Sequence, residues 1–133
     1  MRIVLDTNVL VSGLLNPVGS PGRILDLVLD GKITVLYDDR ILGEYQEVLA
    51  RPELPISPDQ VQPVLNYLRL AGERVNALPL PQEALPDPDD FPFAEAALTG
   101  KAEALVTGNR KHFMNLAAIE KIVLSPQELL KLF

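Results

Sequence analysis

Apolar and polar residues along this chain form short apolar runs that are separated by amphipathic stretches. The first run, Ile3 to Leu5, is too short for a helix and predicts a buried strand. The run breaks at Asp6, and apolar or small residues then return at helical spacing through Leu14. A carboxylate is therefore expected where a buried strand ends and a helix begins.

The same pattern continues along the rest of the chain. Further strands are expected at 33–36, 74–78, 104–107 and 121–124, of which 74–78 would be an edge strand. Helices are expected between Ser20 as N-cap and Gly31 as stop, from a cap at Asp38 or Asp39 to Arg51, and at 61–72, 91–99 and 126–132. Strands that alternate with helices predict a mostly parallel sheet that is covered on both faces.

Composition places the chain among ordinary globular proteins. Its 133 residues, of which 47% are apolar and 23% charged, fit a single domain spanning 1–133. Because cysteine is absent, a disulfide framework and a thiol nucleophile are excluded. Neither a signal-peptide pattern nor an apolar stretch of membrane-spanning length is present, so a cytoplasmic location without membrane contact is expected.

The net charge of −6 argues against a general nucleic-acid binder, which usually carries a basic surface. A bound divalent cation reverses the local sign of charge. An acidic protein can therefore act on a polyanion if its carboxylates are gathered around a metal ion.

Three further segments can bring polar groups to the sheet edge that Asp6 marks. Glu44 falls on the border of an apolar helical face, where a glutamate is usually only solvated. The segment 87–90 contains three aspartates before a helix, more than one N-cap requires, so Asp90 could be either a cap or a metal ligand. Asn109 follows an apolar strand, although turn chemistry alone explains a Gly-Asn pair.

A cationic cluster follows directly after Asn109. Arg110 and Lys111 would flank the acidic edge and could hold phosphates, although charged loop residues are usually just solvated. His112, the only histidine, is expected to be a surface residue rather than a ligand or a general base.

This residue set favours hard, oxygen-preferring ions such as Mg²⁺ or Mn²⁺ over zinc. Such ions can activate water and stabilise the leaving oxygen in phosphodiester cleavage. Paired carboxylates would also suit glycoside hydrolysis, but tryptophan is absent and no aromatic sugar platform is evident. A nucleophile elbow, a Walker loop and a dinucleotide fingerprint are all missing.

Four short motifs, in this order, resemble those of PIN domains. They are Asp6-Thr7-Asn8-Val9, Ile41-Leu42-Gly43-Glu44-Tyr45, Asp87-Pro88-Asp89-Asp90 with Phe93, and Leu105-Val106-Thr107-Gly108-Asn109. The set is most similar to VapC-type toxins of toxin–antitoxin pairs. The resemblance implies a three-layer α/β/α fold whose five-stranded parallel sheet has the strand order 3-2-1-4-5.

The resemblance also implies an endoribonuclease that depends on Mg²⁺ or Mn²⁺, acts as a homodimer and is inhibited by an antitoxin. Asp6, Glu44 and Asp90 would ligate the metal, and Asn109 would complete the catalytic set. The residues expected to support the site or hold the RNA substrate are Asn8, Thr107, Arg110 and Lys111.

Two positions depart from the family pattern, and two other hypotheses remain open. Many family members carry aspartates where this chain has Asn109 and His112, which weakens the case for a second metal. The first alternative is therefore a scaffold that binds RNA or an antitoxin without cleavage. The second is a phosphotransfer enzyme with Asp6 as nucleophile, but such enzymes need a second acid where this chain has Asn8.

Overall fold

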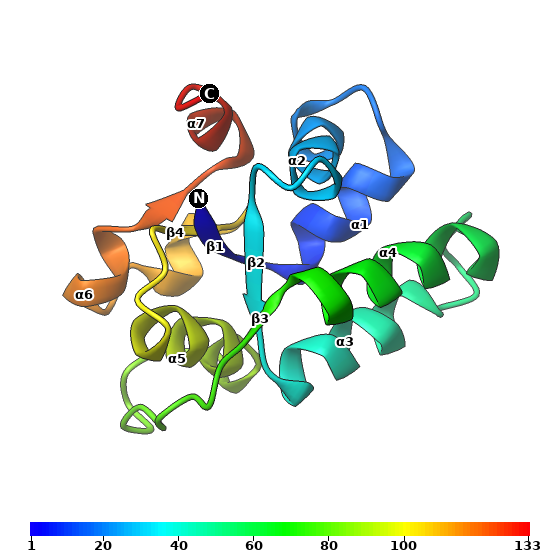
Figure 1. Ribbon diagram of the computed structural model, residues 1–133. Coiled ribbons are helices and arrows are strands. Elements are labelled where there is room, and N and C mark those ends of the chain that lie inside the picture. The colour runs from blue at the N-terminus through cyan, green and yellow to red at the C-terminus, as the bar shows by residue number, and fades with distance from the viewer.

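A five-stranded sheet runs through the middle of the molecule, and all four pairs of neighbouring strands are parallel (Figure 1). The structure is a computed structural model that describes all residues, 1–133. The strands are β1 (Arg2–Leu5), β2 (Thr34–Tyr37), β3 (Glu73–Arg74), β4 (Ala104–Val106) and β5 (Val123–Leu124). Their order, β3-β2-β1-β4-β5, confirms the order that the sequence resemblance implies.

Seven α-helices and two 3-10 turns connect the strands. The helices are α1 (Thr7–Leu15), α2 (Ser20–Leu29), α3 (Asp39–Leu49), α4 (Pro58–Ala71), α5 (Phe91–Thr99), α6 (Ala117–Glu120) and α7 (Pro126–Leu130). The 3-10 turns are η1 (Pro88–Asp90) and η2 (Arg110–Phe113). In Figure 1, α5 and α6 lie on the left, below β4, and α2 and α7 lie at the top with α1 below α2 on the right. This arrangement confirms the three-layer α/β/α class.

The central strand explains why the chain begins with a continuous apolar run. β1 pairs with β2 on one side and with β4 on the other, and Ile3, Val4 and Leu5 are completely buried. A parallel strand that is covered on both faces needs apolar residues at every position. Between the helices, Tyr45 of α3 packs near Phe93 of α5, with ring centroids 6.4 Å apart.

Several predicted helix boundaries are confirmed. The carboxylate of Asp38 accepts a hydrogen bond from the backbone N–H of Ile41, so this residue is the N-cap of α3. Ser125 and Glu128 form the predicted capping box of α7. α5 covers the expected range, 91–99.

Other predictions were wrong in detail. The N-cap of α2 is Gly19 rather than Ser20, which is already helical. The second strand begins at Thr34 and ends at Tyr37, one residue later than expected, and the edge strand has two residues instead of five. The short helix α6 was not predicted, and α7 ends at Leu130.

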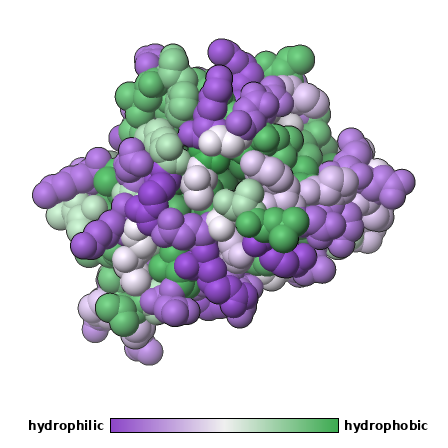
Figure 2. All heavy atoms as spheres, in the orientation of Figure 1, coloured by the Kyte–Doolittle hydropathy of each residue, from purple (hydrophilic) through white to green (hydrophobic).

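The surface mixes polar and apolar residues. In Figure 2, hydrophilic side chains cover the right-hand end of the molecule, and apolar groups are interspersed over the rest of this face. The most exposed large apolar residues are Val18 and Leu70, each 86% exposed. None of the helices is suited to spanning a membrane.

Candidate metal centre

The carboxyl ends of β1 and β4 lie side by side and carry the first two polar residues of the site. Leu5 is in register with Val106, and the backbone N–H of Asp6 donates to the carbonyl of Val106 (2.9 Å). The next residue on each strand, Asp6 and Thr107, therefore emerges at the same edge of the sheet. This is the edge where parallel α/β sheets bind ligands.

Asp6 is held firmly although it is nearly buried, with 7% of its surface exposed. One carboxylate oxygen, Oδ2, accepts a hydrogen bond from the Thr107 hydroxyl (2.7 Å), and Oδ1 accepts one from the backbone N–H of Thr7 (2.8 Å). Burial raises the pKa of Asp6, while the hydrogen bonds from Thr107 and Thr7 act in the opposite direction. These bonds fix the orientation of the carboxylate without neutralising its charge.

Asn8 and Asn109 connect the two strand ends. The side-chain oxygen of Asn8 accepts a hydrogen bond from the backbone N–H of Gly108 (3.3 Å). The backbone N–H of Asn109 donates to the Thr107 hydroxyl oxygen (3.0 Å), which in turn donates to Asp6. Asn8 and Thr107 thus make hydrogen bonds at the place where the sequence resemblance expects supporting residues.

Glu44 reaches the site from α3. Its neighbour Tyr45 is fully buried and donates its hydroxyl hydrogen bond to the carbonyl of Leu5, which fixes this turn of the helix against the end of β1. The Glu44 carboxylate accepts a hydrogen bond from the Thr7 hydroxyl. Burial raises the pKa of Glu44, and the negative charges of Asp6 and Asp89 raise it further.

Asp90 stands at the end of η1, directly before α5. Asp90 occupies the N-cap position of α5, while Asp87 caps η1, where its carboxylate accepts the backbone N–H of Asp89 (2.9 Å). Asp90 makes no capping hydrogen bond and is only 8% exposed. Burial raises the pKa of Asp90 to about 6, and the charges of Asp6 and Asp87 also raise it, against the lowering effect of His112.

α5 is fixed in place by a buried glutamate that the sequence analysis overlooked. One Glu95 oxygen pairs with Arg40 of α3 (2.7 Å), and the other accepts the backbone N–H of Leu80 (2.8 Å). Glu95 therefore connects α5 to α3 and to the proline-rich loop that precedes Asp87. Through these contacts it helps to position Asp90.

The acidic residues surround one hollow of about 420 Å³. Its lining residues are Asp6, Thr7, Asn8, Val11, Ser12, Glu44, Val48, Asp89, Asp90, Asn109 and His112. The four positions that the sequence analysis placed in the catalytic set, Asp6, Glu44, Asp90 and Asn109, are all in this group.

The two basic residues are placed differently. Neither Arg110 nor Lys111 lines the hollow, and the Arg110 guanidinium pairs with Glu128 of α7 (2.8 Å). Both side chains are exposed, so their expected contact with substrate stays a prediction.

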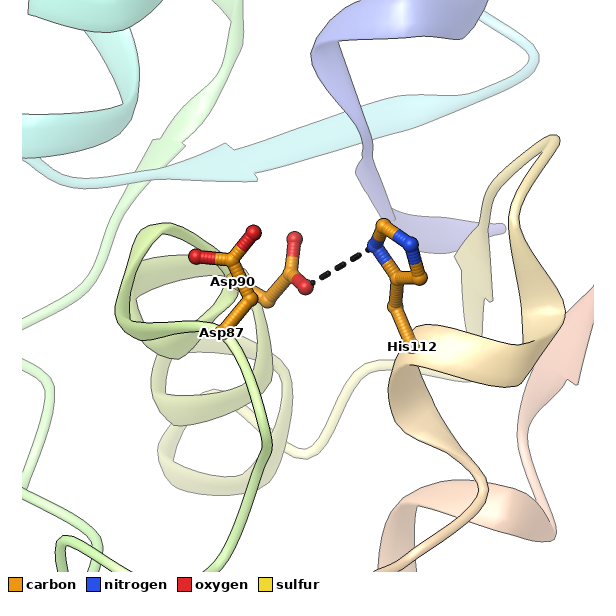
Figure 3. Close-up of side chains that lie close together, drawn as sticks. All are labelled: Asp87, Asp90 and His112. Atoms are coloured by element: carbon orange, nitrogen blue, oxygen red, sulfur yellow. Dashed lines mark ion pairs between the residues drawn. The ribbon is translucent and has the colours of Figure 1, made fainter.

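Sequence reasoning missed two contacts at the site. The hydroxyl of Thr7 binds Glu44, and a threonine in the first helical turn after Asp6 could have suggested such a contact. His112 has an exposed side chain, as expected, but its Nδ1 lies 3.1 Å from Oδ2 of Asp90 (Figure 3). Its position depends on the 3-10 turn η2, which carries no clear sequence signal.

The donor set fits a divalent cation. Oδ2 of Asp90 is buried, and its one polar partner is Nδ1 of His112 at 3.1 Å, a contact without hydrogen-bond geometry. A buried carboxylate oxygen with so little support is costly unless a cation lies nearby. Asp6 and Glu44 face the same hollow, so three carboxylates can offer oxygen ligands from three different elements. Such an all-oxygen set suits Mg²⁺ or Mn²⁺.

The α/β fold and the acidic edge define a class of protein that sequence comparison identifies. The sequence profile of the PIN domain matches residues 2–111, and the chain belongs to this family. PIN domains are generally nucleases that use divalent metals. An uncharacterised protein of Methanocaldococcus jannaschii is 33% identical over 113 residues, which cover 83% of this chain and 72% of that protein.

Among solved structures, the chain is similar to VapBC2 from Rickettsia felis, crystallised with a DNA fragment from its promoter. The match has a TM-score of 0.58 and covers 94% of this chain and 98% of the matched chain. Because the two sequences are only 20% identical, this similarity supports the shared fold alone.

Proposed function

We propose that this protein is a metal-dependent endoribonuclease and the toxin component of a toxin–antitoxin pair. The observation that carries the proposal is the convergence of Asp6, Glu44 and Asp90 on one hollow, where the buried Asp90 oxygen has no polar partner other than His112. Membership of the PIN family supports nuclease chemistry, and the similarity of fold to VapBC2 agrees with the toxin assignment.

Asp6, Glu44 and Asp90 would hold Mg²⁺ or Mn²⁺, with Asp6 at the centre because it directly follows β1, the middle strand. A divalent cation, when bound, supplies a nucleophile at neutral pH and offsets the charge that develops on the phosphodiester. Thr107 and Thr7 keep the carboxylates of Asp6 and Glu44 in fixed orientations, so little reorganisation is needed during the reaction. Asn109, at the rim of the hollow, can orient a substrate oxygen with its side-chain amide.

The expected partners follow from charge and from the family. The RNA backbone would enter over the acidic hollow with its charge neutralised by metal, and Arg110 or Lys111 would contact phosphates outside it. An antitoxin segment that enters the same hollow would present arginine or lysine to Asp6, Glu44 and Asp90. A homodimer is expected by analogy with the toxins of this family.

The decisive test is RNA cleavage with and without Mn²⁺ by the Asp6→Asn variant. Loss of the central charge is expected to reduce cleavage by about a hundredfold or more, because the metal site contributes several kcal/mol to the transition state. Glu120→Gln, which alters an exposed glutamate on α6, provides the matched control and is expected to cleave normally. Undiminished cleavage by a folded Asp6→Asn protein would contradict the proposal.

The alternative is a PIN scaffold that binds RNA or an antitoxin without cleaving. It is favoured by Asn109, a neutral residue at the rim of the hollow, and by His112, which faces Asp90 where many family members carry an aspartate. Calorimetric titration with Mn²⁺ separates the two functions. Absence of binding at millimolar metal would favour the scaffold.

A further inference from the structure

A second cavity, of about 370 Å³, opens beside the acidic hollow. Its wall is built by α1, α2, α7 and the segment after β4, and Figure 1 shows α2 and α7 next to each other at the top of the molecule. The residues that line this amide pocket are Asn8, Val9, Ser12, Pro21, Gly108, Asn109, Pro126 and Gln127. Asn8, Ser12 and Asn109 also line the acidic hollow, so the two cavities are adjacent.

The amide pocket differs from the hollow in its charge. None of its lining residues is ionisable, whereas four carboxylates and one imidazole line the hollow. A metal ion or a phosphate group in the amide pocket would have no side chain of opposite charge beside it, which makes its transfer from water costly. A neutral polar ligand therefore suits this pocket better than an ion does.

Three side chains of the amide pocket carry hydrogen-bonding groups that no protein atom uses. Ser12, Asn109 and Gln127 enter hydrogen bonds within the protein through backbone atoms only. They come from three separate segments, namely α1, the turn after β4, and α7. A side-chain amide offers a donor and an acceptor together, and the edge of a nucleobase presents the same pair of groups.

Apolar groups complete the wall of the amide pocket. Pro126 is buried, Val9 is almost completely buried, and Pro21 at the start of α2 is half-buried. A proline ring loses no rotamer freedom when a ligand packs against it. Unpaired bases in enzyme pockets are commonly held in this way, by hydrogen bonds to the base edge and by apolar side chains against the ring face.

An ion pair connects the two sides of the amide pocket. Arg110 directly follows Asn109, Glu128 directly follows Gln127, and the two charged side chains pair at 2.8 Å. Glu128 is also part of the capping box with Ser125. The ion pair joins η2 to α7 and so limits how far Asn109 and Gln127 can move apart.

We propose that the amide pocket binds one unpaired base of the substrate RNA, while the phosphate of the same nucleotide lies over the acidic hollow. The inference rests on the proposed function, because it concerns the substrate of the same site. Asn109 and Gln127 bind the edge of the base, and the two prolines contact its face. The bases of single-stranded RNA are free to enter such a pocket, whereas those of a duplex are stacked and paired. The pocket therefore selects single-stranded RNA.

The test is a titration of the natural full-length protein with each of the four ribonucleoside 5′-monophosphates in Mg²⁺ buffer, followed by the NMR signals of the side-chain amides. The signals of Asn109 and Gln127 are identified by their loss in Asn109→Ala and Gln127→Ala. At least one nucleotide is expected to shift both signals. Ribose 5-phosphate, which has the sugar and the phosphate but no base, is expected to shift neither.

The affinities of two variants separate base binding from phosphate binding. Gln127→Ala should weaken the binding of that nucleotide about fivefold, because a hydrogen bond to the base is lost, and should leave the affinity for ribose 5-phosphate unchanged. Gln62→Ala removes an exposed amide on α4, outside the amide pocket, and provides the matched control. This control variant should bind the nucleotide as the natural protein does.

Two outcomes would overturn the inference. One is that no nucleotide shifts the signals of Asn109 and Gln127 at millimolar concentration, and the other is an unchanged nucleotide affinity in Gln127→Ala. In either case, metal-dependent RNA cleavage that Asp6→Asn abolishes would leave the proposed function intact. Conversely, base-dependent binding by a protein that cleaves no RNA would support the amide pocket and contradict the proposed nuclease.

Discussion

Asp90 shows how much a single residue contributes to the character of this site. Its carboxylate is almost buried, lies near the charges of Asp6 and Asp87, and has one oxygen without a hydrogen-bond donor. Burial is the largest cause that opposes ionisation and the charges of Asp6 and Asp87 add to it, so the pKa of Asp90 rises to about 6 against the lowering effect of His112. The ionised form of Asp90 is therefore destabilised in the metal-free protein, and a bound cation would stabilise it.

The raised pKa of Asp90 predicts that the stability of the metal-free protein depends on pH. The pKa of Asp90 is higher in the folded chain than in the unfolded chain, so the folded state binds more protons between about pH 4 and pH 6. The free energy of unfolding should consequently fall as pH rises through this window, by at most about 3 kcal/mol from this residue. Asp90→Asn should remove that part of the pH dependence, so the variant gains stability over the natural protein as pH rises.

Chemical denaturation in chelator-containing buffer at pH 4 to 7 measures the effect. Asp6 and Glu44 have raised pKa values as well and shift stability in the same direction, so some pH dependence remains in the variant. A parallel pH dependence for the variant and the natural protein would show that Asp90 is not the group responsible.

At the scale of elements, the connection between α1 and α2 packs closely against α2 only because position 22 has no side chain. A Cβ atom on Gly22 would lie 2.2 Å from the carbonyl oxygen of Pro17, a backbone atom that cannot move aside easily. Gly43 lies in the middle of α3, is exposed, and would have nothing within 4 Å of an added Cβ. Packing therefore requires a glycine at position 22, whereas no contact requires one at position 43.

The contrast predicts opposite effects of the same substitution. Gly22→Ala should lower the free energy of unfolding by about 1–3 kcal/mol, because the backbone between α1 and α2 must shift. Gly43→Ala should raise it by about 0.5–1 kcal/mol, because alanine has the higher helix propensity and no contact is disturbed. Thermal or urea unfolding of both variants checks the signs, and stabilisation by Gly22→Ala would contradict the packing described here.

Elements with strong local signals were predictable, and those defined by tertiary contacts were not. The apolar run of β1, the cap at Asp38 and the capping box at Ser125 are chemical signals carried by a few adjacent residues. The register of β2 and the length of β3 depend on pairing with a neighbouring strand, which the sequence does not display. The helix α6 had no clear signal either, because four residues are too few to show a helical period in the sequence.

In the candidate site, too, contacts set by the strand ends could be predicted, whereas contacts set by the tertiary fold could not. Asp6 and Thr107 could be placed together because parallel strands end at a common edge, and the structure shows them hydrogen-bonded. The contact of His112 with Asp90 could not be foreseen, because it joins two 3-10 turns whose mutual placement is set by the fold. Arg110 was expected to flank the hollow, but its guanidinium forms an ion pair with Glu128 of α7 instead.

At the scale of the whole molecule, negative charge is in excess and is concentrated at one place. The chain carries a net charge of −6, and the hollow gathers Asp6, Glu44, Asp89 and Asp90. Carboxylates that share a small volume repel one another, which lowers the stability of the metal-free state. A ligand that binds only the folded state and relieves this repulsion should stabilise the entire chain.

Mn²⁺ is accordingly expected to raise the melting temperature. At a free concentration about 100 times its dissociation constant, the ion should add about 2.7 kcal/mol to the free energy of unfolding. For a domain of this size the melting temperature should rise by about 10 °C. Chelator should reverse the shift, and Asp6→Asn should reduce it, as measured by calorimetry. An equal shift for the natural protein and Asp6→Asn would place the bound ion elsewhere.

The central position of β1 has a consequence for the newly made protein. β1 pairs with β4, about a hundred residues later in the chain, and Asp6 has its Thr107 partner only when that strand is present. At a synthesis rate of about 5–20 residues per second, β4 is made about 5–20 s after β1. A nascent chain therefore carries no assembled acidic hollow until β4 has been made.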